Sequence, residues 1–171
     1  ELVEIGAILV GTEDFAERGE FHALVKPVKN PQLSDYFVEL AGIRQETVDR
    51  EGVTLSEALD RFSRWARNRD LYSYGSDDAD IRNNCVLIGV PFPFDPARCF
   101  DVCSKCVEYT DVRAVFERHG VPARKYMSST IIEAFGKKSG RHGHDALSDA
   151  RTISDSLRKL KLMIESARPG A

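Results

Sequence analysis

The sequence lacks the features of a membrane protein and of a protein that coats nucleic acid. No stretch approaches the ~20 consecutive apolar residues of a membrane-spanning helix, and no charged-then-apolar leader with a cleavage site is present. Positive charge is scarce, because 24 Lys and Arg stand against 27 Asp and Glu, giving a net charge of −3 and a pI near 5.9. Any nucleic-acid substrate must therefore be held locally. We expect a soluble, cytoplasmic protein.

Cysteine is also scarce, with four residues in 171. In a chain of this size without an export signal, reduced thiols are favoured over a disulfide framework. Cys85 lies in an apolar run and is predicted to belong to the core. The other cysteines have nearly the spacing of zinc ligands, although the second closely spaced pair of a strong zinc motif is missing. This candidate zinc set is Cys99, Cys103 and Cys106, with His119 or His142 as the fourth ligand.

The length and the 42% hydrophobic content predict one α/β domain over residues 1–171. Residues 1–10 are nearly continuous in apolar side chains, which suits a strand covered on both faces. The chain begins inside this strand without a methionine, so we expect a preceding segment. Residues 21–27 form the second predicted strand, antiparallel to the first because the connection is short, and Pro27 and Pro31 end it.

Capping residues predict two helices in the next part of the chain. Ser34 begins a short helix that Gly42 ends. Thr54 and Glu57 form a capping box for a longer helix. A solvated face explains the arginines on this second helix better than a phosphate track does. These arginines are Arg61, Arg64, Arg67 and Arg69.

Strands and helices alternate through the middle of the chain. Residues 71–75 predict a buried strand, and helical patterns follow at 81–88, 112–119 and 129–135. Residues 91–96 form a proline-rich loop, in which packing explains Phe92 and Phe94 better than base stacking. The alternation predicts a mostly parallel sheet covered by helices, with an antiparallel pair at its beginning. Residues 75–80, rich in aspartate, would then follow the carboxyl end of a strand, where functional groups collect in such sheets.

The last predicted helix carries the most titratable groups at its start. Asp149 lies on the flank of its apolar stripe, an expensive place for a lone carboxylate. His144 can approach Asp149 only from the turn before the helix, because five helical steps of ~100° separate them. A structural alternative is that His144 or Asp145 caps the helix and Asp149 pairs with an arginine. The stripe consists of Ala146, Ala150, Ile153, Leu157, Leu160 and Ile164.

These residues resemble a known family. Residues 144–150, His-Asp-Ala-Leu-Ser-Asp-Ala, match the third motif of the DEDDh 3′-to-5′ exonucleases. Residues 32–43 with the following Thr-Val-Asp are similar to the ERI-type and KapD-like branch, which includes RNA-trimming enzymes. The resemblance covers essentially the whole chain and implies a ribonuclease H-like mixed sheet flanked by helices. In that branch a Gly-x-x-Asp turn carries the second-motif aspartate, which by position is Asp78, with Asp77 as the alternative.

The resemblance implies a two-metal hydrolysis of phosphodiester bonds from the 3′ end of RNA, or of DNA. Two Mg²⁺ or Mn²⁺ ions suit carboxylate ligands, here Asp78 and Asp149. His144 would accept the proton of the attacking water. Three cations before His144 would contact the substrate backbone, although a flexible charged loop explains them equally well. They are Lys137, Lys138 and Arg141.

Two departures from the family pattern concern the first half of the chain. Ala41 stands where the family often has threonine. The first motif, Asp-x-Glu on a central strand, is absent, and Glu1 and Glu4 have the wrong spacing to replace it. We expect that motif on a segment before Glu1, and we expect no useful catalysis from a chain that truly starts there.

Two other functions stay open on the sequence. One is a non-catalytic relative that uses the same fold to bind nucleic acid or a protein. The other is a zinc-stabilised interaction module built on the candidate zinc set. The oligomeric state cannot be read from the sequence.

Overall fold

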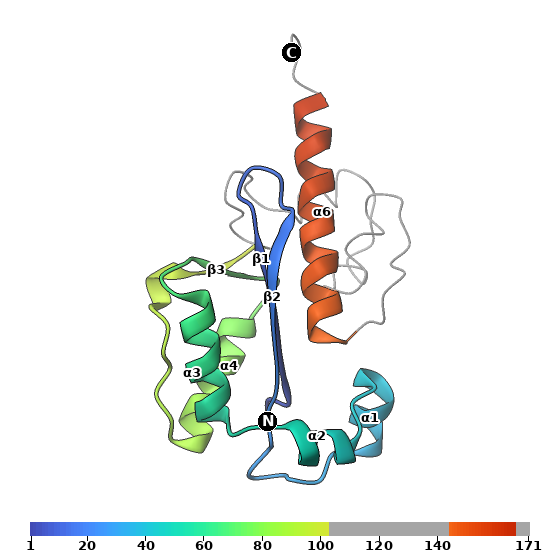
Figure 1. The fold of residues 1–171 in the computed structure, drawn as a ribbon, viewed down its shortest axis with the longest axis vertical. Coiled ribbons are helices and arrows are strands. Elements are labelled where there is room, and N and C mark those ends of the chain that lie inside the picture. The colour runs from blue at the N-terminus through green and yellow to red at the C-terminus, as the bar shows by residue number, and fades with distance from the viewer. Residues whose placement is uncertain (103–143, 167–171) are drawn as a thin grey trace. The chain divides into compact units, whose positions relative to one another are not determined.

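The computed structural model describes residues 1–102 and 144–166 (Figure 1). Contacts divide the chain into two compact units. The first consists of Glu1–Gly6 and Phe21–Val112, and the second of Ala7–Glu20 and Arg113–Ala171. Two of the predicted helices, at 112–119 and 129–135, lie outside the described residues, as do Cys103, Cys106, His119 and His142.

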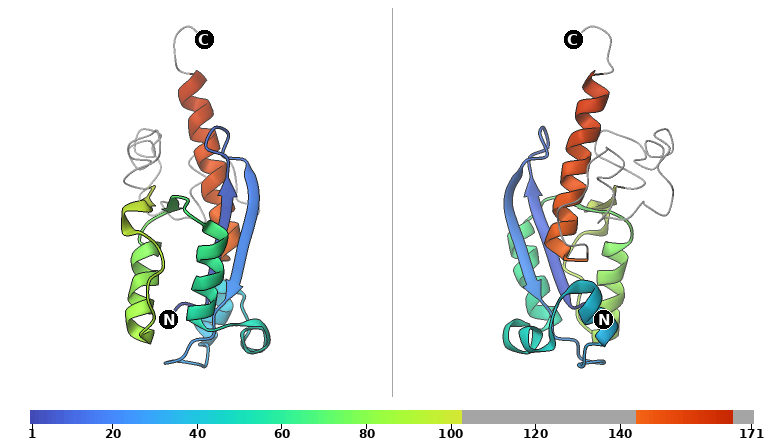
Figure 2. Two further views of the ribbon diagram at one scale, coloured as in Figure 1. Left: turned by 60° about the vertical axis from the view of Figure 1, so that its left-hand side comes forward. Right: turned by 90° about the vertical axis from the view of Figure 1, so that its right-hand side faces the viewer.

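The chain begins with a β-hairpin. Strands β1 (Glu4–Val10) and β2 (Glu17–Leu24) form a two-stranded sheet, and Figure 2 shows their arrows running in opposite directions, as predicted. β2 begins at Glu17, four residues before the expected position. Ile5 is the one residue of β1 that is buried in the described structure, and the other six are partly covered, so neither face of the strand is fully exposed.

Three helices follow the hairpin. α1 (Asp35–Ala41) begins at Ser34, whose side chain accepts a hydrogen bond from the backbone N–H of Phe37, and ends at Gly42 with φ 71°. This confirms the predicted caps. α2 (Gln45–Glu51) has no side-chain hydrogen bond at its N-cap, and no sequence signal predicted it. It packs Val48, fully buried, against Val3 and Leu33.

α3 (Leu55–Ala66) starts at Thr54, which caps the N–H of Glu57 at 3.2 Å, and it buries Leu55, Ala58, Leu59, Phe62 and Ala66. The reciprocal half of the capping box is replaced, because the Glu57 carboxylate pairs with Arg61. Phe62 lies at the centre of an aromatic group, with ring centroids 5.0 Å from Phe21 and 5.0 Å from Phe94. Phe94 also contacts Phe92, with ring centroids 5.4 Å apart, so the packing expected for the loop at residues 91–96 is present.

The first unit also contains a parallel pair of short strands. β3 (Leu71–Ser73) and β4 (Cys99–Asp101) pair in register, so that Tyr72 lies opposite Phe100. The two sheets stay separate in the described part of the chain, whereas the sequence predicted one mostly parallel sheet. The short 3₁₀ helix η1 (Pro96–Arg98) leads into β4.

α4 (Asp77–Ile88) starts four residues earlier than its apolar pattern indicated. Aspartates favour a helix N-terminus because they interact well with its positive end. The carboxylates predicted for a loop therefore occupy the first turn of a helix. Gly89, with φ 76°, ends α4, and Cys85 is buried as expected.

The last helix, α6 (Ala146–Ser166), buries hydroxyl side chains as well as part of its predicted apolar stripe. Leu157 is buried, but Ile153 is half-exposed and three hydroxyl residues are buried: Thr152, Ser154 and Ser156. Helical carbonyls satisfy two of the hydroxyls, since Thr152 donates to the Ser148 carbonyl at 2.8 Å and Ser156 to the Thr152 carbonyl at 2.7 Å. Buried hydroxyls that are hydrogen-bonded cost little, so an apolar pattern alone does not identify these buried positions.

Polar side chains of α6 bind the hairpin within the second unit. Arg151 forms ion pairs with Glu17 and Glu20, and the hydrogen bonds that it donates to Glu17, foremost among the causes, raise the pKa of its guanidinium. Arg158 and Ser154 both donate to the Phe15 carbonyl, at 2.7 and 2.8 Å. Of the helices the structure describes, none is long and apolar enough to cross a membrane.

Candidate active site

The start of α6 places the predicted histidine where the sequence required it. His144 is exposed and lies in a turn, outside the helix that begins at Ala146. Its φ of 65° is in the left-handed region, which costs a residue with a Cβ about 1–2 kcal/mol. A strained residue kept at a helix entrance is typical of positions selected for function rather than for stability.

The helix cap is Asp145, which decides between the two structural alternatives. Its carboxylate accepts a hydrogen bond from the Ser148 N–H at 2.7 Å, and its carbonyl accepts one from the Asp149 N–H at 2.9 Å. Capping thus explains Asp145 and leaves His144 outside the cap. Asp149 is half-buried in the first turn of the helix.

The other predicted carboxylate lies in the first unit, after the carboxyl end of β3. Gly75, with φ 105°, makes the turn between β3 and α4, where glycine avoids the strain of a side chain. Asp78 follows in the first turn of α4, half-buried, and pairs with Arg82 one turn later. The side chain of Arg82 also lies over the Phe92 ring, 5.0 Å from its centroid.

Several carboxylates crowd this end of the parallel strands. Desolvation, followed by the charges of Asp80, Asp101 and Asp78, raises the pKa of Asp77. The Asp77 side chain is nevertheless exposed to solvent. The negative charges of the neighbouring carboxylates therefore explain its raised pKa better than desolvation does. A concentration of negative charge at the carboxyl ends of parallel strands attracts cations.

Asp101 is a further carboxylate at this point, and no sequence motif indicated it. It ends β4, and its carboxylate accepts a hydrogen bond from the Gly75 N–H at 2.8 Å. The available signal was a carboxylate at the end of a short apolar and aromatic run, comparable to the aspartate-rich residues 75–80 that follow the predicted strand at 71–75. The nearby cysteines drew attention to zinc instead.

The donor types fit a divalent metal ion, while the described residues do not gather a complete set. Carboxylate oxygens such as those of Asp78 and Asp149 are the ligands that Mg²⁺ and Mn²⁺ prefer. Within the described ranges, no three His, Cys, Asp or Glu side chains lie together in a way that could hold a metal. An ion at Asp78 would also compete with Arg82 for the carboxylate.

The structure thus brings His144 and Asp149 to the start of one helix in the second unit and places Asp78 in the first unit. The convergence of all three around metal ions stays a prediction. The three predicted substrate-binding cations, Lys137, Lys138 and Arg141, lie outside the described residues.

Comparison with known sequences points to nucleases. A family model described as "Exonuclease" matches residues 1–156. The 3′-5′ exonuclease Snipper of Drosophila melanogaster is 27% identical over 183 residues, which cover 100% of this chain and 62% of that protein. ERI1 exoribonuclease 2 of Mus musculus is 36% identical over 173 residues, covering 90% of this chain and 24% of that protein. The chain therefore spans less than two thirds of either relative.

Solved structures show the same fold. The nuclease domain of 3′hExo, a DEDDh family member bound to rAMP, matches with a TM-score of 0.73 at 23% identity, over 96% of this chain and 81% of that chain. A full-length 3′-exonuclease matches with a TM-score of 0.75 at 20% identity, over 94% of this chain and 53% of that chain. These matches confirm the predicted class, a mixed α/β fold of the ribonuclease H-like type.

Proposed function

This chain belongs to the DEDDh 3′-5′ exonuclease family, and from that premise we propose that it takes part in metal-dependent removal of nucleotides from the 3′ end of RNA. The observation that carries the proposal is the start of α6. His144 stands exposed and strained in the turn, Asp145 alone serves as the cap, and Asp149 follows in the first turn of the helix. Helix capping therefore does not explain why a histidine stands at position 144, whereas a role in proton transfer would explain it.

The proposed roles follow from the type and position of each side chain. His144 accepts a proton from the attacking water, for which an imidazole outside the helix has the necessary freedom of approach. Asp149 and Asp78 hold divalent ions. Such ions, when bound, activate the water and stabilise the leaving 3′ oxygen. Lys137, Lys138 and Arg141 bind the phosphates of the incoming strand.

RNA is the proposed substrate because of the relatives' names. Several are exoribonucleases, and one matched structure describes recognition of the 3′ end of a histone mRNA stem-loop by a 3′-exonuclease. DNA is the second substrate to test.

The decisive experiment measures shortening of a 5′-labelled single-stranded RNA by the full protein, with Mg²⁺ or Mn²⁺ and with EDTA. Removal of single nucleotides from a free 3′ end, abolished by EDTA, is expected. His144→Asn should lower the rate by roughly 10²-fold or more, because it removes the base while asparagine tolerates the left-handed backbone. His22→Asn is the matched control, since His22 pairs with Glu4 on the hairpin and has no proposed role.

Other outcomes lead to different conclusions. RNA binding without any hydrolysis would replace the enzyme by the non-catalytic relative. Unchanged hydrolysis by His144→Asn would remove this residue from the mechanism. Stoichiometric zinc in the purified protein would support the interaction module based on Cys99, Cys103 and Cys106.

A further inference from the structure

The four arginines of the α3 region fall into two classes. Arg61 and Arg64 pair with Glu57 and Asp60, one helical turn earlier, so their charges are compensated on the same helix. The solvated-face interpretation is confirmed for these two. The remaining two arginines differ, and they are Arg67 and Arg69.

No carboxylate of the described structure pairs with Arg67 or Arg69. Arg67 ends α3, and its side chain makes neither a hydrogen bond nor an ion pair with the described residues. Its φ of 54° is in the left-handed region. Arg69 donates only to the main-chain carbonyls of Trp65 and Ala66, at 3.5 and 3.3 Å. Both guanidinium groups therefore keep donors for a ligand.

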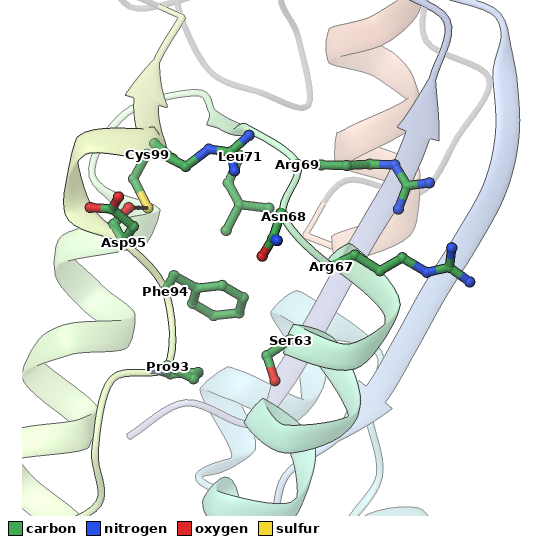
Figure 3. A pocket seen from close by; sticks show the side chains of 10 residues that line it. Ser63, Arg67, Asn68, Arg69, Leu71, Pro93, Phe94, Asp95 and Cys99 are labelled. Carbon is green, nitrogen blue, oxygen red and sulfur yellow. Dashed lines mark hydrogen bonds between the residues drawn. The ribbon is translucent and has the colours of Figure 1, made fainter.

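These two arginines border a pocket of about 240 Å³ inside the first unit. Figure 3 shows Phe94 reaching into it toward Ser63 and Asn68, while the side chains of Arg67 and Arg69 start at its border and extend away from Phe94. Leu71 and Cys99, which begin the paired strands β3 and β4, also line it. The pocket thus lies at the start of these strands, and the carboxylates of the candidate active site follow their ends.

The lining combines one aromatic ring with unused polar groups. Phe94 is half-buried and rests edge-on against Phe62, with a ring angle of 64°. The Asn68 amide is exposed and has no hydrogen bond within the described structure, so it can both donate and accept. Ser63 donates to the Asp60 carbonyl at 3.0 Å and keeps its lone pairs. An aromatic face with nearby donors and acceptors suits a nucleobase.

The charge of the lining is positive despite the net negative charge of the chain. Arg98 is compensated by Asp70 at 2.7 Å, and the Asp95 carboxylate caps the Ala97 N–H at 2.9 Å. Arg67 and Arg69 remain as the uncompensated cations beside the pocket. The volume is below the roughly 300 Å³ at which pockets for drug-sized ligands begin, so a single base fits better than a larger molecule.

We propose that this pocket is a second RNA-binding site, which takes one base of a single strand against Phe94 and holds neighbouring phosphates with Arg67 and Arg69. The class of ligand rests on the proposed function. The site itself is separate from His144, Asp149 and Asp78. Its task is to grip the body of a strand whose 3′ end is being processed, which a protein of net charge −3 needs to do locally.

The test measures binding in EDTA, so that it does not depend on hydrolysis. Fluorescence anisotropy of a labelled 12-nucleotide oligouridylate is recorded at several salt concentrations for the full protein. The variant carrying Arg67→Gln and Arg69→Gln should reduce the slope of log K against log[salt] by about 1.4, because each lost phosphate contact on a single strand contributes about 0.7. The matched control carries Arg61→Gln and Arg64→Gln, which makes the same charge change on paired arginines and should leave the slope unchanged.

A second variant tests the pocket itself. Asn68→Asp removes no packing from an exposed side chain, and its new charge should weaken binding of the oligonucleotide about fivefold. Equal slopes for the two double variants, unchanged binding by Asn68→Asp, or no binding by the unsubstituted protein would overturn the inference. If the unsubstituted protein hydrolyses RNA and the two double variants have equal salt slopes, the proposed pocket is rejected and the proposed function stands. If only the variant with Arg67→Gln and Arg69→Gln has a reduced slope and the unsubstituted protein does not hydrolyse RNA, the exonuclease activity is rejected and the RNA-binding pocket stands.

Discussion

Asp101 and Gly75 join the ends of the two parallel strands, because the carboxylate of Asp101 accepts a hydrogen bond of 2.8 Å from the Gly75 backbone N–H. Asp101 ends β4, and Gly75 makes the turn that leads from β3 into α4. Side-chain to backbone hydrogen bonds of this kind fix turns that no ladder bond reaches. The turn that precedes Asp78 is thus held by a residue from another strand.

Replacing Asp101 tests this link. Asp101→Ala should lower the free energy of unfolding by about 1–3 kcal/mol, since it removes a charged acceptor and leaves the N–H without its partner. Asp101→Asn keeps an acceptor oxygen and should cost less than half as much. Urea unfolding of both variants measures the difference. Equal losses for the two would show that charge, rather than the hydrogen bond, is what matters.

A second prediction concerns the pH dependence contributed by Asp77. Its pKa is raised in the folded state, by desolvation and by Asp80, Asp101 and Asp78, so the ionised carboxylate destabilises the fold. This penalty is absent below the unfolded value of 3.8 and grows as the pH rises through the folded pKa. Asp77→Asn should therefore raise the melting temperature at pH 7 and leave it unchanged near pH 3.

The expected gain for Asp77→Asn is below about 1 kcal/mol, because solvent screens an exposed group and the helix N-terminus favours an acid. Asp35→Asn is the control, since Asp35 begins α1 as Asp77 begins α4. The control should lose stability slightly at pH 7. A loss of the same size for Asp77→Asn would contradict the assigned repulsion.

A third prediction concerns the hairpin turn that α6 holds. The Phe15 carbonyl accepts from Ser154 at 2.8 Å and from Arg158 at 2.7 Å, and Phe15 itself is buried with φ 49°. Ser154→Ala or Arg158→Met leaves one donor in place, so each should cost about 0.5–1.5 kcal/mol. The double variant leaves a buried carbonyl unsatisfied and should exceed the sum of the single losses by about 1 kcal/mol. Losses that add within about 0.5 kcal/mol would show that the two bonds are independent.

Local signals predicted those parts of the fold that local interactions decide. Ser34, Thr54, Gly42 and Gly89 mark helix ends because a cap needs a particular side chain or backbone conformation. α2 lacks such a signal, since its helix is short and its one buried residue, Val48, forms part of a core built from distant segments. Sequence patterns over a few residues carry no information about those partners.

The candidate site divides in the same way. The position of His144 just outside a helix followed from the geometry of five helical steps, and the structure confirms it. The burial of Thr152 and Ser156 on α6 could not be predicted from apolar residues, because each hydroxyl donates a hydrogen bond to the helix backbone. Asp101 escaped notice because its partner, Gly75, is 26 residues away and is reached only through strand pairing.

The last prediction separates stability from function at His144. A residue with a Cβ is strained at φ 65°, and glycine is not, so His144→Gly gains about 1–2 kcal/mol from the backbone. Against this, glycine loses about 0.5–1 kcal/mol of conformational entropy on folding. The side chain is exposed, so little packing is lost. We expect His144→Gly to be at least as stable as the unsubstituted protein, and His144→Ala, which keeps the strain, to gain nothing.

Thermal unfolding of the three proteins measures this order of stability, and hydrolysis of 5′-labelled RNA measures the cost. If His144 is the proposed base, glycine and alanine should both lose roughly 10²-fold or more in rate, whatever their stability. Asp145→Ala should instead lose stability and keep hydrolysis. Loss of the helix cap should cost about 0.5–2 kcal/mol, while the imidazole of His144 remains. A marked loss of stability in His144→Gly would instead mean that the histidine is retained for the fold.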